Sequence, residues 1–118
     1  MSIFFVGIGG ALGAILRYLI SLIPVRSEFP VLTLATNVIG AFAIGYIVAL
    51  SKKYNLPNYV VLMLKTGVCG GFTTFSTFSL EACRLFESEK IVMGITYAGL
   101  SLALCIAAVL LGEAAAAG

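Results

Sequence analysis

Long apolar runs separated by short polar segments dominate the hydrophobic pattern of this chain. The runs cover residues 3–23, 31–50, 58–86 and 91–112. A helix rises 1.5 Å per residue, so about 20 apolar residues cross the hydrocarbon core of a bilayer. The pattern therefore predicts a single domain over residues 1–118, an all-α integral membrane protein with four transmembrane helices.

The third run is too long for one straight crossing, and it contains a stretch that a plain helix tolerates poorly. Residues 67–79 have the sequence GVCGGFTTFSTFS, with three glycines, five hydroxyls and three phenylalanines. A glycine pair weakens a helix, and irregular backbone at membrane depth survives only where protein or a cavity surrounds it. We therefore expect the third helix to break near residues 70–73, and we expect functional groups at that break.

Composition agrees with a membrane protein and argues against several other classes. Of the 118 residues, 61% are hydrophobic and 10% are charged, which is not the composition of a soluble domain. The net charge of +2 is too small and too scattered to indicate a nucleic-acid partner. Cys69, Cys83 and Cys105 lie in or near apolar runs and indicate neither a disulfide framework nor a zinc site. No basic residue precedes the first run, so we expect no cleaved signal peptide.

Basic residues are balanced between the two sides that four spans define. The side of the termini would hold three of them and the other side four: Lys52, Lys53 and Lys65 against Arg17, Arg26, Arg84 and Lys90. Because an excess of Lys and Arg normally fixes the cytoplasmic side, this balance leaves the orientation undetermined. Either the chain inserts in both directions or a partner protein determines its orientation. Insertion in both directions favours an antiparallel, dual-topology homodimer with a two-fold axis in the membrane plane.

Small and polar residues inside the first two spans have structural explanations as well as functional ones. Gly9 and Gly13 have the small-xxx-small spacing that lets another helix approach closely, which favours helix packing. Arg17 lies inside the end of its run, where it either snorkels outward, the simpler explanation, or attracts anions at a pore mouth. Asn37 either bonds neighbouring helices together or points a donor at a pore. Its position alone does not separate these two roles.

A helix that resumes after the break would place aromatic and hydroxyl groups side by side. Phe75 and Phe78 are neighbours at i, i+3 spacing on one face. A polar stripe lies beside them, formed by Thr74, Thr77 and Glu81. Paired phenylalanines usually pack in a core, and hydroxyls can bond back to the preceding turn. A functional role is favoured because all these residues follow a helix break.

The polar groups inside the spans are mostly neutral amides and hydroxyls beside aromatic rings. There is no histidine, no apolar-embedded acid pair and no lysine suited to a phosphate loop, so we expect no enzyme. Hydroxyl and amide donors can replace water around an anion, and the edge of a phenyl ring is its positive part. Without a deep lysine, a small, strongly hydrated anion would bind weakly enough to leave. Unwound carbonyls near Gly70 and Thr73 would suit an alkali cation, with two from each chain of a dimer.

Three motifs resemble the Fluc family of small fluoride channels, also called CrcB-type proteins. They are GALGAILRY at residues 10–18, TNVIG at residues 36–40 and the stretch at residues 67–79. The resemblance implies an antiparallel, dual-topology homodimer with two pores in the plasma (inner) membrane. It would export fluoride passively and so lower the concentration and toxicity of fluoride in the cytoplasm. The chain departs from the family at Val68, where members often have phenylalanine, and Lys65 precedes the motif.

The resemblance also implies roles for individual residues. Phe75 and Phe78 correspond to the pore phenylalanines of the family, and Asn37 to its fluoride-coordinating asparagine. The carbonyls of Gly70 and Thr73 correspond to a central structural Na⁺ site at the dimer interface. The positions where a polar track would run are Ser76, Thr77, Glu81, Tyr97 and Ser101.

Two other functions suit a chain of this size. A small dual-topology multidrug/proton antiporter needs a membrane-embedded carboxylate near the centre of an early helix, but the first two runs contain no Asp or Glu, and Glu81 lies toward the end of the third. A non-transporting assembly subunit would tolerate replacement of its polar residues by apolar ones.

Overall fold

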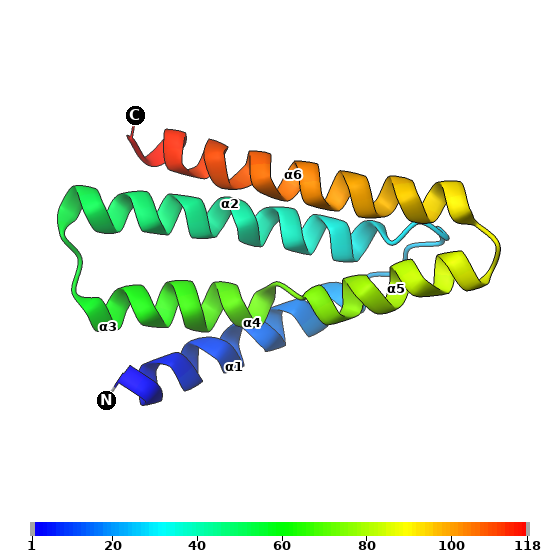
Figure 1. The fold of residues 1–118 in the computed structure, drawn as a ribbon. Helices are drawn as coiled ribbons and strands as arrows, with labels where there is room; N and C mark the ends of the chain where they lie inside the picture. The colour runs from blue at the N-terminus through cyan, green and yellow to red at the C-terminus, as the bar shows by residue number, and fades with distance from the viewer. Residues whose placement is uncertain (1, 118) are drawn as a thin grey trace.

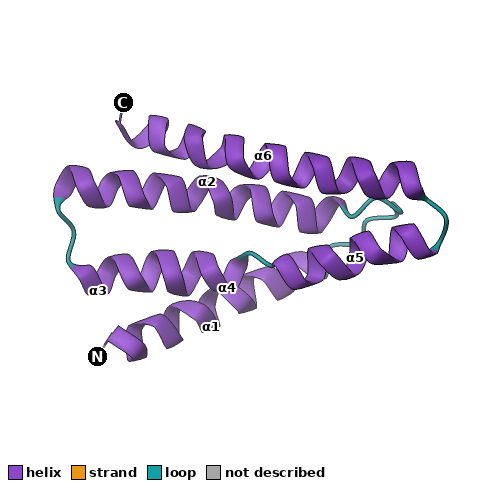
Figure 2. Ribbon diagram, viewed as in Figure 1, coloured by secondary structure: helices purple, strands orange, loops and turns teal. Residues whose placement is uncertain are grey.

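The computed structural model describes residues 2–117, and all regular structure within them is helical (Figures 1 and 2). Two long helices, α1 (Ser2–Ser21) and α2 (Val31–Tyr54), come first, and α6 (Ile91–Ala117) comes last. Four shorter helices lie between α2 and α6: α3 (Asn58–Val61), the π-helix η1 (Leu62–Cys69), α4 (Gly70–Phe72) and α5 (Phe75–Glu87). Residues 58–87 therefore occupy the place of the predicted third span.

The helices alternate in direction along the chain. The start of α1, the end of α6 and the α2–α3 connection lie at one end of the molecule, and the other two connections lie at the opposite end (Figure 1). In the part of the chain that the structure describes, α1, α2 and α6 are long and apolar enough to cross a membrane. The segment of residues 58–87 consists of helices that are each too short. This arrangement is that of a multi-pass membrane protein.

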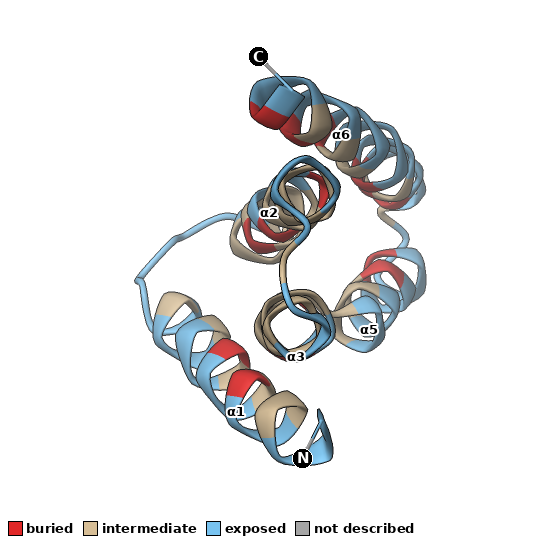
Figure 3. Cartoon of the chain, turned by 90° about the vertical axis from the view of Figure 1, so that its left-hand side faces the viewer, coloured by how far each residue is buried: buried red, intermediate tan, exposed pale blue. Residues whose placement is uncertain are grey.

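Many of the buried residues are small, whereas most large apolar residues are exposed. Figure 3 shows the exposed positions spread over the outer faces of the helices. Val92 is 80% exposed and Leu110 is 63% exposed. Lipid is as apolar as leucine, so helices in a membrane associate through close contact between small residues. Tyr97, which is fully buried, and Leu85 are exceptions, and they form a buried cluster with Ala82. The exposed apolar surface agrees with the predicted all-α membrane protein.

Glycines bring α1 into backbone contact with η1 and α4. A Cβ atom on Gly13 would overlap the Val68 carbonyl oxygen and lie 2.7 Å from the Phe72 nitrogen. A Cβ atom on Gly71 would lie 3.1 Å from Cα of Gly10. Neither space admits a side chain without a shift of backbone. The packing role predicted for Gly9 and Gly13 is confirmed, since Gly9 makes the same kind of contact with Gly67.

Two helices extend beyond the ends that the apolar runs predict. Helix α2 continues to Tyr54 rather than residue 50 and stops at Asn55, whose φ of 53° is left-handed and whose N–H donates to the Ser51 carbonyl. Helix α6 continues to Ala117 rather than residue 112, and Lys53 Nζ donates to the Ala116 carbonyl over 3.5 Å. Apolar runs end at the first charged residues, whereas a capped helix can continue past the hydrocarbon core.

The non-helical residues in the third segment are threonines and not the glycines on which the predicted break was centred. Gly70 is helical, with φ −63° and ψ −39°. Thr73 and Thr74 are extended, with φ/ψ of −83°/157° and −150°/121°. The extended residues overlap the expected range of residues 70–73 at Thr73 and reach one residue beyond it. Neither glycine of the pair has a positive φ, and only Gly71 needs its small size, because a Cβ there would lie 2.5 Å from the Gly10 carbonyl oxygen of α1.

Candidate functional site

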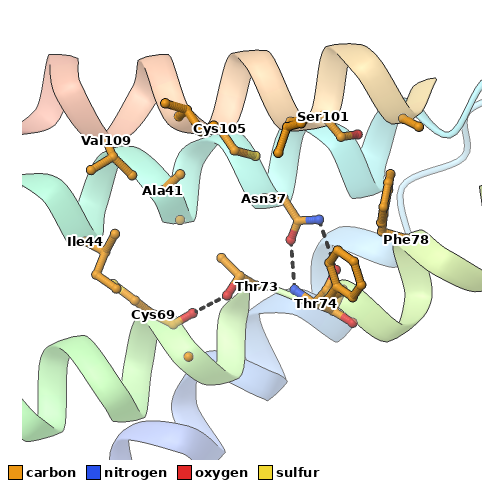
Figure 4. Close-up of a pocket in the computed structure, with 16 residues that line it drawn as sticks. Asn37, Ala41, Ile44, Cys69, Thr73, Thr74, Phe78, Ser101, Cys105 and Val109 are labelled. Atoms are coloured by element: carbon orange, nitrogen blue, oxygen red, sulfur yellow. Dashed lines mark hydrogen bonds between the residues drawn. The ribbon is translucent and has the colours of Figure 1, made fainter. Parts of the chain in front are cut away.

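The side chain of Asn37, which lies on α2, pairs with the backbone of Thr74, one of the two extended residues. Its Oδ1 accepts from the Thr74 N–H over 2.8 Å, and its Nδ2 donates to the Thr74 carbonyl over 3.0 Å (Figure 4). An amide can do both because it carries a donor and an acceptor in one plane. This geometry supports the first sequence-based alternative, a bond between helices. One Nδ2 hydrogen remains for another partner.

The bonds between Asn37 and Thr74 leave some carbonyl groups at the break without the N–H donors that a helix provides. In a continuous α-helix, the Thr74 N–H would donate to Gly70 and the Thr77 N–H to Thr73. Here the first is bound to Asn37, and the second donates to Thr74 Oγ1 over 3.2 Å and so caps α5. The carbonyl oxygens of Gly70 and Thr73 therefore lose the donors that a continuous helix would supply. Carbonyl oxygens of this kind are suitable ligands for an alkali cation.

Arg17 reaches the same region from α1. Its Nε donates to the Gly71 carbonyl over 3.2 Å, at the end of α4. The side chain is half-buried, and it turns back into the protein rather than outward. The simpler expectation, that Arg17 snorkels to the membrane surface, does not describe this geometry.

A cavity of about 430 Å³ opens beside the break, between α2, α6 and the third segment (Figure 4). Its 16 lining residues carry no charged side chain. Six of the predicted site residues lie in it: Asn37, Gly70, Thr73, Phe75, Phe78 and Ser101. Ser101 is 7% exposed, and its hydroxyl is buried and has no hydrogen-bond partner among the described residues. The cavity thus offers neutral polar groups in an otherwise apolar lining.

Aromatic rings form a row at one end of this cavity. The ring centroids of Phe75 and Phe78 lie 5.3 Å apart, and those of Phe78 and Tyr97 lie 5.1 Å apart. Phe75 is 78% exposed, and so faces out of the chain. The Tyr97 hydroxyl donates to Glu81 Oε1 over 3.2 Å. This row of rings therefore runs from the cavity to the carboxylate of Glu81, which already accepts a hydrogen bond from Tyr97.

Besides Arg17, four other predicted residues do not line this cavity. Glu81 and Tyr97 form the neighbouring pair on α5 and α6, while Ser76 and Thr77 lie in the first turn of α5. Ser76 Oγ is 3.1 Å from Thr74 Oγ1. Ser76 and Thr77 are thus linked to the cavity through Thr74, whereas Tyr97 meets the cavity through the ring of Phe78.

The sequence analysis did not single out Gly40, and it placed Thr74 in a polar stripe without predicting its bond to Asn37. A Cβ atom on Gly40 would overlap Cγ2 of Thr73 and lie 3.3 Å from a ring carbon of Phe72, so Gly40 makes room for the extended backbone. Thr74 supplies both the N–H and the carbonyl that Asn37 binds. One feature of the sequence could have indicated the role of Gly40. It follows Asn37 by three residues, nearly one helical turn, so both lie on the face of the helix toward the break.

The fold and the site together define a small multi-pass membrane protein with a neutral polar cavity at an interrupted helix. A family model described as CrcB-like protein, Camphor Resistance (CrcB), matches residues 4–113. The chain belongs to this family, and the resemblance inferred from its motifs is confirmed.

Curated relatives cover most of the chain. A protein of Azobacteroides pseudotrichonymphae named fluoride-specific ion channel FluC is 45% identical over 115 residues, which are 94% of this chain and 92% of that protein. Proteins with the same name come from Ruminiclostridium cellulolyticum, at 45% identity over 92% of this chain and 86% of the relative, and from Rhizobium etli, at 44% over 94% and 92%.

Proposed function

We propose that this protein is a fluoride-selective channel that exports fluoride passively across the plasma membrane. The observation that carries the proposal is the cavity at the break, which combines uncharged donors with phenyl rings and has no charged lining residue. Amide and hydroxyl N–H and O–H groups can replace the water around a small anion. A site without a fixed countercharge holds such an ion weakly enough to release it. The names of the relatives supply the identity of the ion.

The residues of the cavity have separate tasks in this proposal. Asn37 offers its remaining Nδ2 hydrogen, and Ser101 offers a buried hydroxyl that has no partner among the described residues. Phe75 and Phe78 present ring edges, the positive part of the aromatic quadrupole. The polar track then continues with the other predicted residues, which are Ser76, Thr77, Glu81 and Tyr97. Because Tyr97 donates to Glu81, the carboxylate is partly screened from a passing anion.

We further propose that two chains form an antiparallel, dual-topology homodimer with two pores. Support comes from the balanced basic residues and from the open side of the cavity, where Phe75 is 78% exposed. A large aromatic ring in that position would be covered by a second chain. Residues 58–87 would then act as one broken span.

A structural Na⁺ ion at the dimer interface is part of the same proposal. Gly70 and Thr73 fit this role because their carbonyls lose their helical donors at the break. Two carbonyls from each chain would give four oxygen ligands around the two-fold axis, and oxygen is what an alkali cation requires. The ion supplies no step in conduction; it would hold the two chains together.

Growth in fluoride tests the export function directly. A bacterium that lacks its own fluoride exporter should grow in fluoride at low external pH when it expresses this chain. The same cells should gain no resistance to cationic dyes, because the multidrug/proton antiporter alternative requires a carboxylate early in the chain. Dye resistance without fluoride tolerance would contradict the proposal. A non-transporting assembly subunit would give neither phenotype.

A further inference from the structure

Arg17 continues the contact face of α1 that the glycines begin. Gly10 and Gly13 touch the third segment through their backbones, and Arg17 lies on the same face one turn beyond Gly13. Helical side chains lean toward the N-terminus of their own helix, so a long side chain at this position reaches back along the contact. The Nε atom consequently meets the Gly71 carbonyl at 3.2 Å.

The carbonyl that Arg17 binds lies between two features of the break. Gly71 follows Gly70, one of the two proposed cation ligands, and precedes the extended residues that Asn37 holds. A planar guanidinium donates in a fixed direction, so its bond restrains the orientation of the peptide unit. Arg17 from α1 and Asn37 from α2 thus restrain the two sides of the break.

The charge of Arg17 also suits this position. Helical backbone runs from Asn58 to Phe72, and the carboxyl end of a helix carries partial negative charge. Arg17 does not line the cavity in which the anion donors lie. The position of Arg17 therefore suits a contact with the backbone at the break better than a contact with an anion in the cavity.

We propose that Arg17 is a positioning residue, which holds the Gly71 peptide so that the neighbouring Gly70 carbonyl faces the structural cation. This inference rests on the cation site of the proposed function and not on fluoride selectivity. Without the bond, the backbone between Gly70 and Thr74 would sample other orientations. The cation would then bind more weakly, although the chain would keep its glycine contacts.

Two variants separate geometry from charge. Arg17→Met removes both the charge and the donor, whereas Arg17→Lys keeps the charge but loses Nε and the planar fork. Arg26→Met is the matched control, because Arg26 is exposed in the loop before α2. If Arg17→Met does not fold, Arg17→Lys still provides the comparison.

The first measurement is the sodium concentration that half-protects the purified full-length protein against heat, with a large organic cation replacing Na⁺ at constant ionic strength. The second is amide hydrogen exchange in the peptide that contains residues 70–75. A hydrogen bond to a charged group contributes enough that its loss should raise the sodium midpoint about tenfold. Both Arg17 variants should show this shift and faster exchange, and Arg26→Met should show neither.

Two results would overturn the inference. If Arg17→Lys matches the wild type in both measurements, the charge alone suffices and Nε does not position the peptide. If the wild type itself shows no protection by sodium, the cation site is absent and the inference fails with it. Neither measurement uses fluoride, so these results do not depend on the proposed fluoride channel. If that proposal is wrong, liposomes that contain the wild-type protein will retain fluoride.

Discussion

At the scale of single residues, the site depends on one amide that replaces helical hydrogen bonds. Asn37 satisfies both the N–H and the carbonyl of Thr74. Aspartate lacks the donor and serine cannot span both groups in one plane, so the residue type follows from the geometry. The same amide keeps one hydrogen for a ligand. The two roles weighed from the sequence, helix bond and pore donor, are therefore compatible in one side chain.

Asn37→Ala should destabilise the protein and abolish fluoride flux. The change leaves a half-buried N–H and a carbonyl of Thr74 without partners, which costs about 2 kcal/mol or more. The measurement is the midpoint of thermal dissociation in detergent, together with efflux from liposomes. Asn58→Ala, at the exposed start of α3, should change neither quantity. A stable Asn37→Ala variant would show that the pairing with Thr74 contributes little.

Phe78→Ile should lower fluoride flux while the dimer persists. Isoleucine is apolar and can fill part of the space beside Tyr97, but it has no positive ring edge to meet an anion. An interaction of roughly 1 kcal/mol gives a decrease of about tenfold at most. Efflux per protein and size-exclusion chromatography give the two readouts.

The matched control is Phe4→Ile, since Phe4 is 64% exposed near the start of α1. Its flux should equal that of the wild type. If Phe78→Ile conducts as fast as this control, the proposed role of the ring edge is wrong.

At the scale of elements, the sequence predicted the helices and the interruption, but not which residues of the stretch are extended. Helix-forming runs follow from hydrophobicity, which is local information. The position of the break depends on partners far away in the chain, since Gly40 leaves room for Thr73 and Asn37 binds Thr74. The glycine pair suggested flexible backbone, whereas Gly71 serves close contact with α1.

The residues singled out as a site share a cavity, while their individual roles stay predictions. Asn37, Phe75, Phe78 and Ser101 were singled out from separate spans, and the structure brings them to one cavity. The bond from Arg17 to Gly71 was not predicted. An arginine near the end of an apolar run can turn in either direction, and only the crossing of α1 with α4 decides which.

Gly13→Ala should loosen the crossing of α1 with η1 and α4. The added methyl group would overlap the Val68 carbonyl, and backbone cannot move aside as a flexible side chain can. Overpacking of this kind costs about 1–3 kcal/mol. A lower thermal midpoint and reduced sodium protection are the expected results.

Gly7→Ala is a matched control on the same helix, because no atom lies within 4 Å of the added Cβ. It should leave the protein unchanged or slightly more stable, since alanine favours a helix by about 1 kcal/mol over glycine. Equal effects of the two substitutions would mean that the crossing contributes little to stability.

At the scale of the whole molecule, the balanced basic residues and the exposed Phe75 both support two chains of opposite orientation. Extra lysines on one side should fix the orientation of every chain. Three lysines at the end that carries the start of α1 give six basic residues against four: Ser2→Lys, Tyr54→Lys and Asn58→Lys. Ser27→Lys with Ser88→Lys gives six against three at the other end. Each design expressed alone should give inactive protein, and coexpression of the two should restore fluoride tolerance.

Full activity of either design alone would contradict the antiparallel dimer. A matched control replaces the same residues with glutamine, which adds no charge and should leave the orientation mixed. Fluoride tolerance of those control cells should equal that of cells with the wild-type chain.

The release of fluoride from liposomes tests the central claim most directly. Liposomes that contain the purified wild-type protein are loaded with fluoride or with chloride, and an ion-selective electrode follows the external concentration after a potassium ionophore removes the charge barrier. An uncharged cavity lined with amide and hydroxyl donors predicts rapid release of fluoride and far slower release of chloride. Equal rates for the two ions, or no release of fluoride, would contradict it.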